Sequence, residues 1–279
     1  MSVAPNRDFL FTDKDFNNIR YLVKKHTGIS LSDQKKNMVY SRLSRRLRSL
    51  ELQSFKEYCC IIESGDSQEL VNFTNSITTN LTSFFRENHH FEFLSSTAIP
   101  EVLKRNIDTR KIRIWCCASS TGEEPYSIAM TVLESIPRNQ SWDIKITATD
   151  LDSNVLATAK QGIYPDDRIS GINKNRIKQW FWKGKGKHEG SAKVNPSLQN
   201  IIDFRQANLL EKWPDDGPFD IVFCRNVVIY FDKPTQRVLF ERIANAMYDD
   251  SYLFIGHSES LFKVSDRFNL IGQTIYKKL

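Results

Sequence analysis

Apolar positions in the first hundred residues recur at helical spacing. Thr12 and Asp15 fit a capping box, and apolar residues follow at every third or fourth position up to Gly28. Further helices are expected over 33–50, 54–63, 67–78 and 89–105. The N-terminal part of the chain is therefore predicted to be helical.

After residue 108 short apolar runs alternate with helical patterns. Strands are expected over 111–116, 144–149, 219–224, 252–256 and 273–277, with helices beginning near Pro125 and over 153–160 and 234–247. This alternation predicts an α/β fold with a mostly parallel sheet. The run 162–205 interrupts it with aromatic residues and a glycine-rich turn, which predicts a small antiparallel insert.

Composition limits the class of protein. The chain has 279 residues, of which 40% are hydrophobic and 26% charged, so disordered, collagenous and coiled-coil classes are excluded. We expect no secretory signal, and no apolar run reaches the ~20 residues of a membrane span. The five cysteines lack zinc-type spacing, and we found no ligand partner for His89 and His90. The sequence therefore predicts a reduced, cytoplasmic protein without a metal.

The net charge of +6 conceals two basic segments. Residues 35–48 carry six Lys or Arg and no acid, and residues 168–193 carry eight against Glu189, so the rest of the chain is net acidic. Such clusters favour an anionic partner, which could be nucleic acid, an anionic membrane or an acidic protein. A solvated surface is the alternative.

The first strand–turn–helix of the predicted sheet is the place where ligands bind in such folds. Its turn, 118–122, consists of small residues, but it matches neither the dinucleotide nor the P-loop motif. Glu123 and Glu124 at the helix entrance would repel phosphate. Asp150 stands where a carboxylate binds ribose hydroxyls. Together they suggest S-adenosylmethionine, which is cationic and has no phosphate. Alternatively, the two glutamates complement the helix dipole and Asp150 caps a helix.

Five segments resemble motifs of the chemotaxis receptor methyltransferase (CheR) family. They are TNLTSFFRE at 79–87, WCCASSTGEEPYS at 115–127, NLL at 208–210, FCRNVVIYFD at 223–232 and GHSE at 256–259. The resemblance implies a helical N-terminal domain over 1–88 and a Rossmann-like class I methyltransferase domain over 89–279. The antiparallel β-subdomain would be inserted at about 162–205.

The resemblance also implies an activity and the residues that perform it. S-adenosylmethionine would donate its methyl group to the γ-carboxylate of receptor glutamates, which gives methyl esters and S-adenosylhomocysteine. Arg86 and Tyr230 would lie beside the reacting carboxylate. Cofactor contacts are implied for Asn80, Thr82, Arg86, Ala118, Glu124, Asp150, Asn208, Leu209, Arg225 and Asn226. Cys117 and Ser119 depart from the usual family pattern but remain small.

The implied partner is the cytoplasmic helical bundle of a chemoreceptor, with which Arg42, Arg45 and Arg46 would dock. The turn containing Lys183, Gly184, Gly186 and Gly190 resembles the element that tethers some family members to a receptor's C-terminal pentapeptide. Lys183 replaces the usual arginine and loses its bidentate contact. We expect a monomer that neither inserts into membranes nor binds nucleic acid.

Two alternatives stay open at this point. The basic segments would suit a nucleic-acid methyltransferase, although 225–230 lacks the Pro-Pro element of enzymes that methylate amino groups in DNA. A catalytically silent, cofactor-sensing scaffold is the other alternative.

Overall fold

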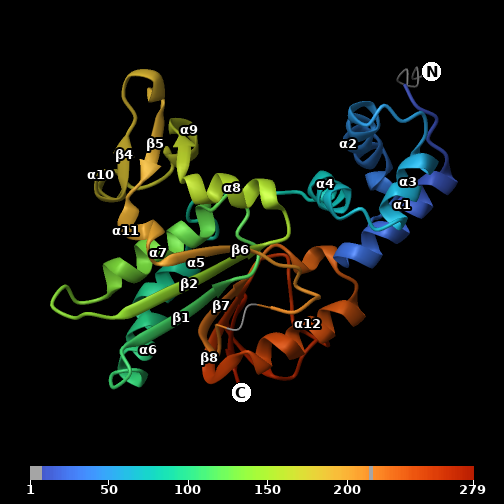
Figure 1. Cartoon of the computed structure of the whole chain (residues 1–279). Coiled ribbons are helices and arrows are strands. Elements are labelled where there is room, and N and C mark those ends of the chain that lie inside the picture. The colour runs from blue at the N-terminus through green and yellow to red at the C-terminus, as the bar shows by residue number, and fades with distance from the viewer. Residues whose placement is uncertain (1–7, 214–215) are drawn as a thin grey trace, which may run out of the picture. The chain divides into compact units, whose positions relative to one another are not determined.

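The structure is a computed structural model that describes residues 8–213 and 216–279. Its contacts form two compact units (Figure 1). One contains the described residues up to Thr79 together with Tyr230–Asp232, and the other contains Asn80–Ile229 and Lys233–Leu279. The division falls after Thr79, whereas the sequence placed the domain boundary after residue 88, because the segment 80–88 makes its contacts with the second unit.

The first unit is helical, as predicted. It comprises α1 Asp13–Thr27, the 3-10 turn η1 Asp33–Lys35, α2 Lys36–Ser49, α3 Phe55–Glu63 and α4 Ser67–Ile77. The Thr12–Asp15 capping box begins α1, and Gly28, with φ of 74°, ends it. The apolar faces bury Leu22, Val39 and Leu43 completely. This core explains why the periodic positions form helices.

The second unit is built on a seven-stranded sheet of order β6-β2-β1-β7-β8-β10-β9. The strands are β1 Lys111–Cys116, β2 Asp143–Asp150, β6 Ile202–Gln206, β7 Phe219–Cys224, β8 Met247–Ile255, β9 Phe268–Gly272 and β10 Ile275–Lys278. The first five strands in this order are parallel, and β10 is antiparallel to both β8 and β9. The mostly parallel sheet is confirmed. Its edge strands β6 and β9 were not singled out, because both are short and only partly buried.

Helices flank this sheet. They include α5 His89–Phe93, α6 Ile99–Arg105, α7 Glu123–Ser135, α8 Ser153–Gln161 and α12 Lys233–Asn245. Helices α7 and α8 pack on β2 and β6, and α12 packs on β8 (Figure 1). The single helix expected over 89–105 is interrupted by a π-helical turn, Leu94–Ala98. Pro100 explains the interruption, because it has no N–H to donate to the preceding turn.

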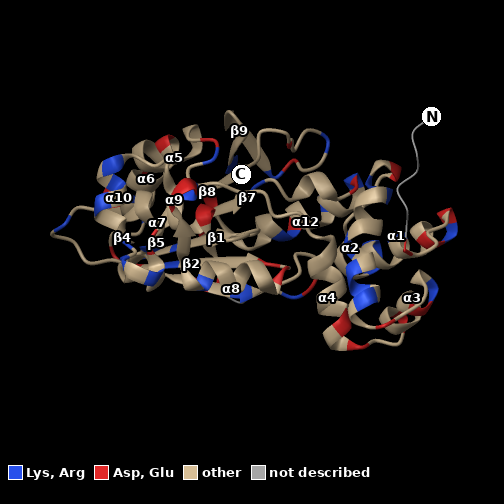
Figure 2. Cartoon of the chain, turned by 90° about the horizontal axis from the view of Figure 1, so that it is seen from above, with Lys and Arg blue, Asp and Glu red and all other residues tan. Residues whose placement is uncertain are grey.

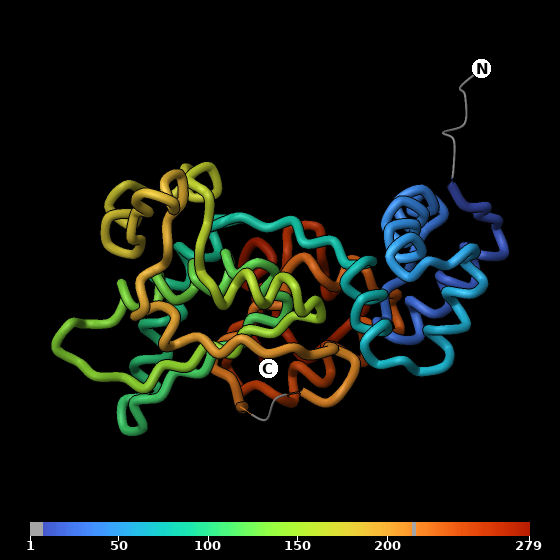
Figure 3. The backbone as a smooth tube through the Cα atoms, turned by 45° about the horizontal axis from the view of Figure 1, so that its top comes forward, coloured from blue at the N-terminus to red at the C-terminus, as the bar shows by residue number. Residues whose placement is uncertain are grey.

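The predicted insert is a three-stranded antiparallel sheet of order β3-β5-β4. It consists of β3 Ile163–Pro165, α9 Asp166–Ile169, α10 Lys174–Trp180, β4 Phe181–Lys183, the 3-10 turn η3 Gly186–His188, β5 Ser191–Val194 and α11 Pro196–Gln199. Its hairpin projects from the body of the second unit (Figure 3). A Cβ at Gly184 would lie 1.9 Å from the His188 carbonyl oxygen, so the turn requires glycine there.

Lys and Arg positions are frequent on α2 and on α10 and β4, which belong to the two basic segments of the sequence (Figure 2). Among residues 8–213 and 216–279, no helix is both long and apolar enough to cross a membrane.

Candidate functional site

The carboxyl ends of β1, β2 and β7 lie side by side. The parallel register pairs Cys116 with Ala148 on one side and with Phe223 on the other. Residues that directly follow these strands therefore reach the same edge of the sheet. This edge is where α/β sheets place their ligands.

The turn after β1 is held close to the sheet by its backbone. Ser119 donates its N–H to the carbonyl of Thr149, and the turn ends at Gly122, whose φ is 99°. A Cβ at Gly122 would lie 2.7 Å from the Tyr164 hydroxyl, so no other residue fits without displacement. The turn leaves the Ser119 hydroxyl buried without a hydrogen-bond partner among the described residues.

Asp150 ends β2 as a buried carboxylate. It accepts the backbone N–H of Ser120 at 2.8 Å and that of Asp152 at 2.9 Å. Burial raises the pKa of Asp150 to about 6, despite these two donors. The residue that caps α8 is Asp152, whose carboxylate accepts the N–H of Asn154. Asp150 is thus not the cap of α8, and the alternative that it serves as one is not supported.

Glu124 and Arg225 form a buried ion pair at the same edge. Glu124 lies in the first turn of α7, Arg225 follows β7, and the nearest nitrogen and oxygen are 2.6 Å apart. The Cys116 thiol donates to the second carboxylate oxygen at 3.3 Å. Desolvation raises the pKa of Glu124, and the Arg225 charge opposes this shift. The Arg225 Nε is also buried without a hydrogen-bond partner among the described residues.

The segment 80–87 lies across this edge. The Asn80 amide donates to Asp152 at 2.8 Å, and its carbonyl accepts the Ser120 hydroxyl at 3.1 Å. Arg86 is half-buried, and its guanidinium donates to the Leu81 carbonyl at 3.0 Å. No ion pair of Arg86 is found in the described part of the chain, so its guanidinium does not serve as one half of a salt bridge there.

The cofactor residues predicted after β6 lie at the end of the strand next to β2. Asn208 accepts the N–H of Leu210 and donates to Glu211 at 3.1 Å. Leu209 is buried, and its carbonyl accepts hydrogen bonds from Trp213 and Arg242. Neighbouring parallel strands thus bring Asn208 and Leu209 to the same edge as Asp150.

The chain matches two family descriptions that together span most of it. Residues 14–78 match "CheR methyltransferase, all-alpha domain", and residues 80–277 match "CheR methyltransferase, SAM binding domain". The chain belongs to the CheR methyltransferase family. It is an S-adenosylmethionine-dependent methyltransferase, and neither the nucleic-acid enzyme nor the silent scaffold is supported.

Curated relatives match along nearly the whole chain. "Chemotaxis protein methyltransferase 2" of Pseudomonas aeruginosa is 44% identical over 98% of this chain and 96% of its own length. "Chemotaxis protein methyltransferase" of Escherichia coli is 43% identical over 95% of this chain and 91% of its own. The Salmonella typhimurium protein of the same name is 42% identical over 95% of this chain and 90% of its own length. These relatives match both units of this CheR protein, the helical one and the one built on the sheet.

The arginines expected to dock with a receptor have different environments in this CheR protein. Arg42 donates to the carbonyls of Ile77 and Thr78 at the end of α4, at 2.9 and 2.7 Å. Arg46 pairs with the buried carboxylate of Glu69 at 2.5 Å. Only Arg45 of the three is exposed. Arg42 and Arg46 therefore stabilise the helical unit itself, a role that the sequence analysis did not foresee.

Tyr230 belongs by its contacts to the helical unit of the CheR protein, where its carbonyl accepts the Ser30 N–H at 2.8 Å.

The remaining predicted cofactor residues lie in the second unit. Thr82 is half-buried on the segment that follows Asn80. Ala118, also half-buried, lies in the turn after β1. Asn226 adopts a positive φ of 56° directly after Arg225.

Glu87 was overlooked by the sequence analysis, although it ends the quoted motif 79–87. Its carboxylate accepts from the His257 ring at 2.9 Å and lies 3.2 Å from Arg225. The partners of Glu87 hold its pKa at about 2 despite partial burial. Glu87 thus ties the loop after β8 to the Arg225 guanidinium.

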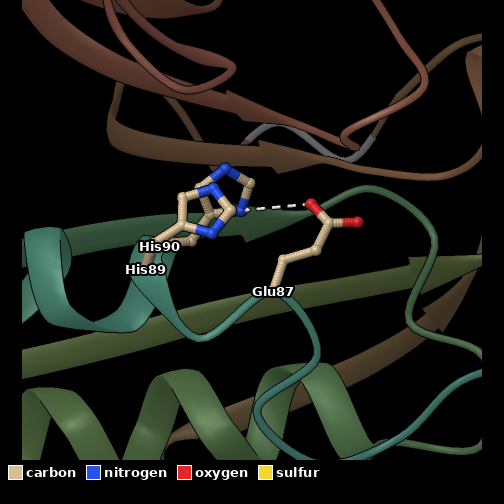
Figure 4. Close-up of side chains that lie close together, drawn as sticks. All are labelled: Glu87, His89 and His90. Carbon is tan, nitrogen blue, oxygen red and sulfur yellow. Dashed lines mark ion pairs between the residues drawn. The ribbon is translucent and has the colours of Figure 1, made fainter.

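His89 and His90 were interpreted as structural because no ligand partner was found for them, but the potential ligand atoms of Glu87, His89 and His90 lie within 4.8 Å of one another (Figure 4). Burial lowers the pKa of His90 to about 3, so its ring is neutral. The Glu87 oxygens already receive Arg225 and His257, and a guanidinium beside them disfavours a second cation. We therefore interpret the cluster as part of an ion-pair network.

Proposed function

We propose that this CheR protein methylates the γ-carboxylate of glutamates on the cytoplasmic helices of chemoreceptors. The proposal is supported by the family membership and by the chemotaxis relatives. The observation that carries its cofactor part is the edge of the sheet that holds both the buried Asp150 carboxylate and the Glu124–Arg225 ion pair.

The residues at this edge fit S-adenosylmethionine. The Asp150 carboxylate would accept the ribose hydroxyls, and the unpartnered Ser119 hydroxyl and Arg225 Nε are donors available to a ligand. Asn80, Asn208 and Leu209 would border the same ligand, as would the other cofactor residues predicted from the sequence. The bound cofactor supplies a methyl carbon on a sulfonium, a good leaving group.

The acceptor needs alignment more than activation. A glutamate carboxylate is already ionised at neutral pH, so no strong general base is required. Arg86 would orient this carboxylate through charge-assisted hydrogen bonds. Tyr230 is assigned to the same step from the sequence, as a hydroxyl donor. Correct placement of the reactants is the effect that supplies most of the rate.

The exposed face of α2 would contact the receptor. Arg45 is exposed on α2 and Lys35 is exposed in the turn directly before it, and acidic receptor helices would be attracted to both. Arg42 and Arg46 would support this face indirectly, because they hold α4 against α2.

The insert would bind the receptor's C-terminal pentapeptide in receptors that have one. β4 is an edge strand whose outer side has no neighbour in the described sheet, so a peptide could add to it as a further strand. Lys183 lies on this strand, and Gly184, Gly186 and Gly190 shape the turn beside it. Such a tether would raise the local concentration of the enzyme.

The proposal is tested by incubating the protein with methyl-labelled S-adenosylmethionine and receptor cytoplasmic domains. A glutamyl methyl ester releases labelled methanol in mild alkali, whereas a methylated amine does not. Receptor domains whose candidate glutamates are replaced by alanine are the control. Label that stays in the protein after alkali treatment, or that is transferred to nucleic acid instead, would overturn the proposal.

A further inference from the structure

Glu259 belongs to the motif 256–259, for which the sequence analysis found no role. Its side chain is 6% exposed and accepts four backbone N–H groups. One oxygen receives Gly256 at 2.6 Å and Asn226 at 2.9 Å. The other receives Val228 at 2.9 Å and Ile229 at 3.3 Å.

These donors come from two turns that follow neighbouring strands. Gly256 follows β8, and residues 226–229 follow β7 and begin the 3-10 turn η4 Val228–Tyr230. The N–H groups at the start of a helical turn have no partner within the turn. The Glu259 carboxylate supplies that partner and joins the two turns.

Close approach of the turns depends on a missing side chain. A Cβ at Gly256 would lie 2.3 Å from the Asn226 amide nitrogen and 2.9 Å from a Glu259 oxygen. Asn226 itself has a φ of 56°, a conformation that costs free energy in a residue other than glycine. The surrounding hydrogen bonds must therefore hold Asn226 in place.

We propose that Glu259 is a positioning residue for the cofactor site, and this inference rests on the proposed function. It acts through Asn226, whose side chain lies 3.4 Å from Glu87, and through Arg225, which directly precedes Asn226. Its carboxylate is saturated by backbone donors, so it neither touches the ligand nor transfers a proton. Without these four bonds the 225–229 turn loses the conformation that presents Arg225 and Asn226.

The test compares Glu259→Gln with Asp220→Asn, a matched buried carboxylate. Asp220 is 1% exposed and accepts the Arg113 N–H and the Arg105 guanidinium, and it lies near the start of β7 rather than at its end. Both variants leave buried donors without their charged acceptor, so both should lower the melting temperature. Only Glu259→Gln disturbs the turn at the carboxyl end.

Affinity for S-adenosylhomocysteine is measured by calorimetry on full-length folded protein, and the Michaelis constant for S-adenosylmethionine is measured with receptor domains. We expect Glu259→Gln to weaken both by at least about tenfold, and Asp220→Asn to leave both within about twofold. Glu259→Asp, which keeps the charge but is shorter, should fall between Glu259→Gln and wild type. If Glu259→Gln binds within twofold of wild type, the positioning role is wrong.

A third variant distinguishes failure of the Glu259 inference from failure of the proposed cofactor site. If Asp150→Asn loses affinity while Glu259→Gln retains it, the cofactor site stands and only the inference falls. If Asp150→Asn also retains full affinity, the placement of the cofactor is wrong, and the inference falls with it. Should Glu259→Gln fail to fold, Glu259→Asp carries the same comparison, and wild-type affinity in that variant would overturn the inference.

Discussion

Glu124 and Arg225 meet at 2.6 Å although they come from a helix and a strand end that are 101 residues apart in sequence. The Arg225 side chain is completely buried, and its guanidinium reaches both Glu124 and Glu87. A buried cation between two carboxylates fixes the start of α7 against the end of β7. This edge of the sheet is thus held by charge as well as by backbone hydrogen bonds.

Breaking this pair should destabilise the protein. We expect Glu124→Gln to lower the free energy of unfolding by about 3 kcal/mol, because it leaves a buried charge with one partner fewer. Denaturant unfolding measures this change. Glu241→Gln is the control, since Glu241 forms an exposed pair with Arg267 and should matter little. Equal stability of the two variants would contradict the role of the pair.

Affinity for the cofactor should depend on pH through Asp150. Its pKa is raised to about 6, so protonation below that pH removes the charge that we propose accepts the ribose hydroxyls. We expect the affinity for S-adenosylhomocysteine to fall as the pH drops through about 6, and Asp150→Asn to bind weakly at every pH. Calorimetry between pH 5 and 8, as a rough range around that pKa, tests this. An unchanged pH profile in Asp150→Asn would show that another group is responsible.

The same shift predicts the opposite effect on stability. A carboxyl group whose pKa is higher in the folded than in the unfolded protein stabilises the fold most at pH values below its pKa in the unfolded protein. For Asp150 this contribution to the free energy of unfolding is lost as the pH rises through about 6. At neutral pH Asp150→Asn removes the desolvation cost of a buried charge, but it also removes an acceptor from the N–H of Ser120 or Asp152. The two effects oppose each other, so we expect a smaller change in stability than in cofactor affinity. Thermal unfolding of the ligand-free proteins at pH 7 provides the comparison. A marked loss of stability would indicate a structural role for Asp150.

Arg86 should matter for turnover and little for folding. Among the described residues, its guanidinium donates a hydrogen bond to the Leu81 carbonyl. We expect Arg86→Ala to lower turnover by about a hundredfold through lost orientation of the acceptor, with a melting temperature close to wild type. Initial-rate measurements with receptor domains test this. Arg86→Lys, which keeps the charge but not the planar fork, should recover only part of the activity, and near-normal turnover of Arg86→Ala would remove Arg86 from the mechanism.

Arg45 and Arg46 are neighbours with different expected roles. Arg45→Ala should reduce kcat/KM for the receptor several-fold and weaken its salt dependence, with unchanged stability, because its side chain is exposed. Arg46→Ala should instead lower the free energy of unfolding by about 2 kcal/mol, because the Glu69 side chain, which is 6% exposed, would lose its charged partner and keep only Tyr58 and Asn72. Activity at several ionic strengths and denaturant unfolding separate the two. Receptor kinetics in Arg45→Ala that match wild type would exclude it from docking.

The pentapeptide tether can be tested on β4. Wild type should bind a receptor C-terminal pentapeptide measurably by calorimetry, and Lys183→Arg should bind it more tightly through a bidentate contact with the terminal carboxylate. Gly184→Ala should abolish binding, since its Cβ would collide with the His188 carbonyl. Lys187→Ala, a change at the exposed turn, is the control. No detectable binding by wild type or by Lys183→Arg would leave the hairpin without this role.

The helices of the N-terminal unit and the buried strands β1, β2 and β7 were predictable because their apolar patterns are local and regular. The edge strands β6 and β9 were not, since half-buried strands carry weaker patterns. The role of Arg42 was also hidden: its position on α2 suggested a surface residue, and only the end of α4 shows what its guanidinium binds. Likewise the sequence alone did not connect Glu87 with His90. A turn brings the Glu87 carboxylate to 3.7 Å from the His90 ring.

The sequence by itself determined the alternation of elements, the small-residue turn after the first strand and the family to which the chain belongs. These are properties of neighbouring residues and of continuous motifs. The tertiary structure alone decided which charges are buried together: Arg225 with Glu124 and Glu87, and Glu259 with the turn after β7. At this edge, side chains distant in sequence meet because parallel strands end side by side. Burial at the edge then shifts the pKa of each carboxylate and determines its hydrogen-bond partners.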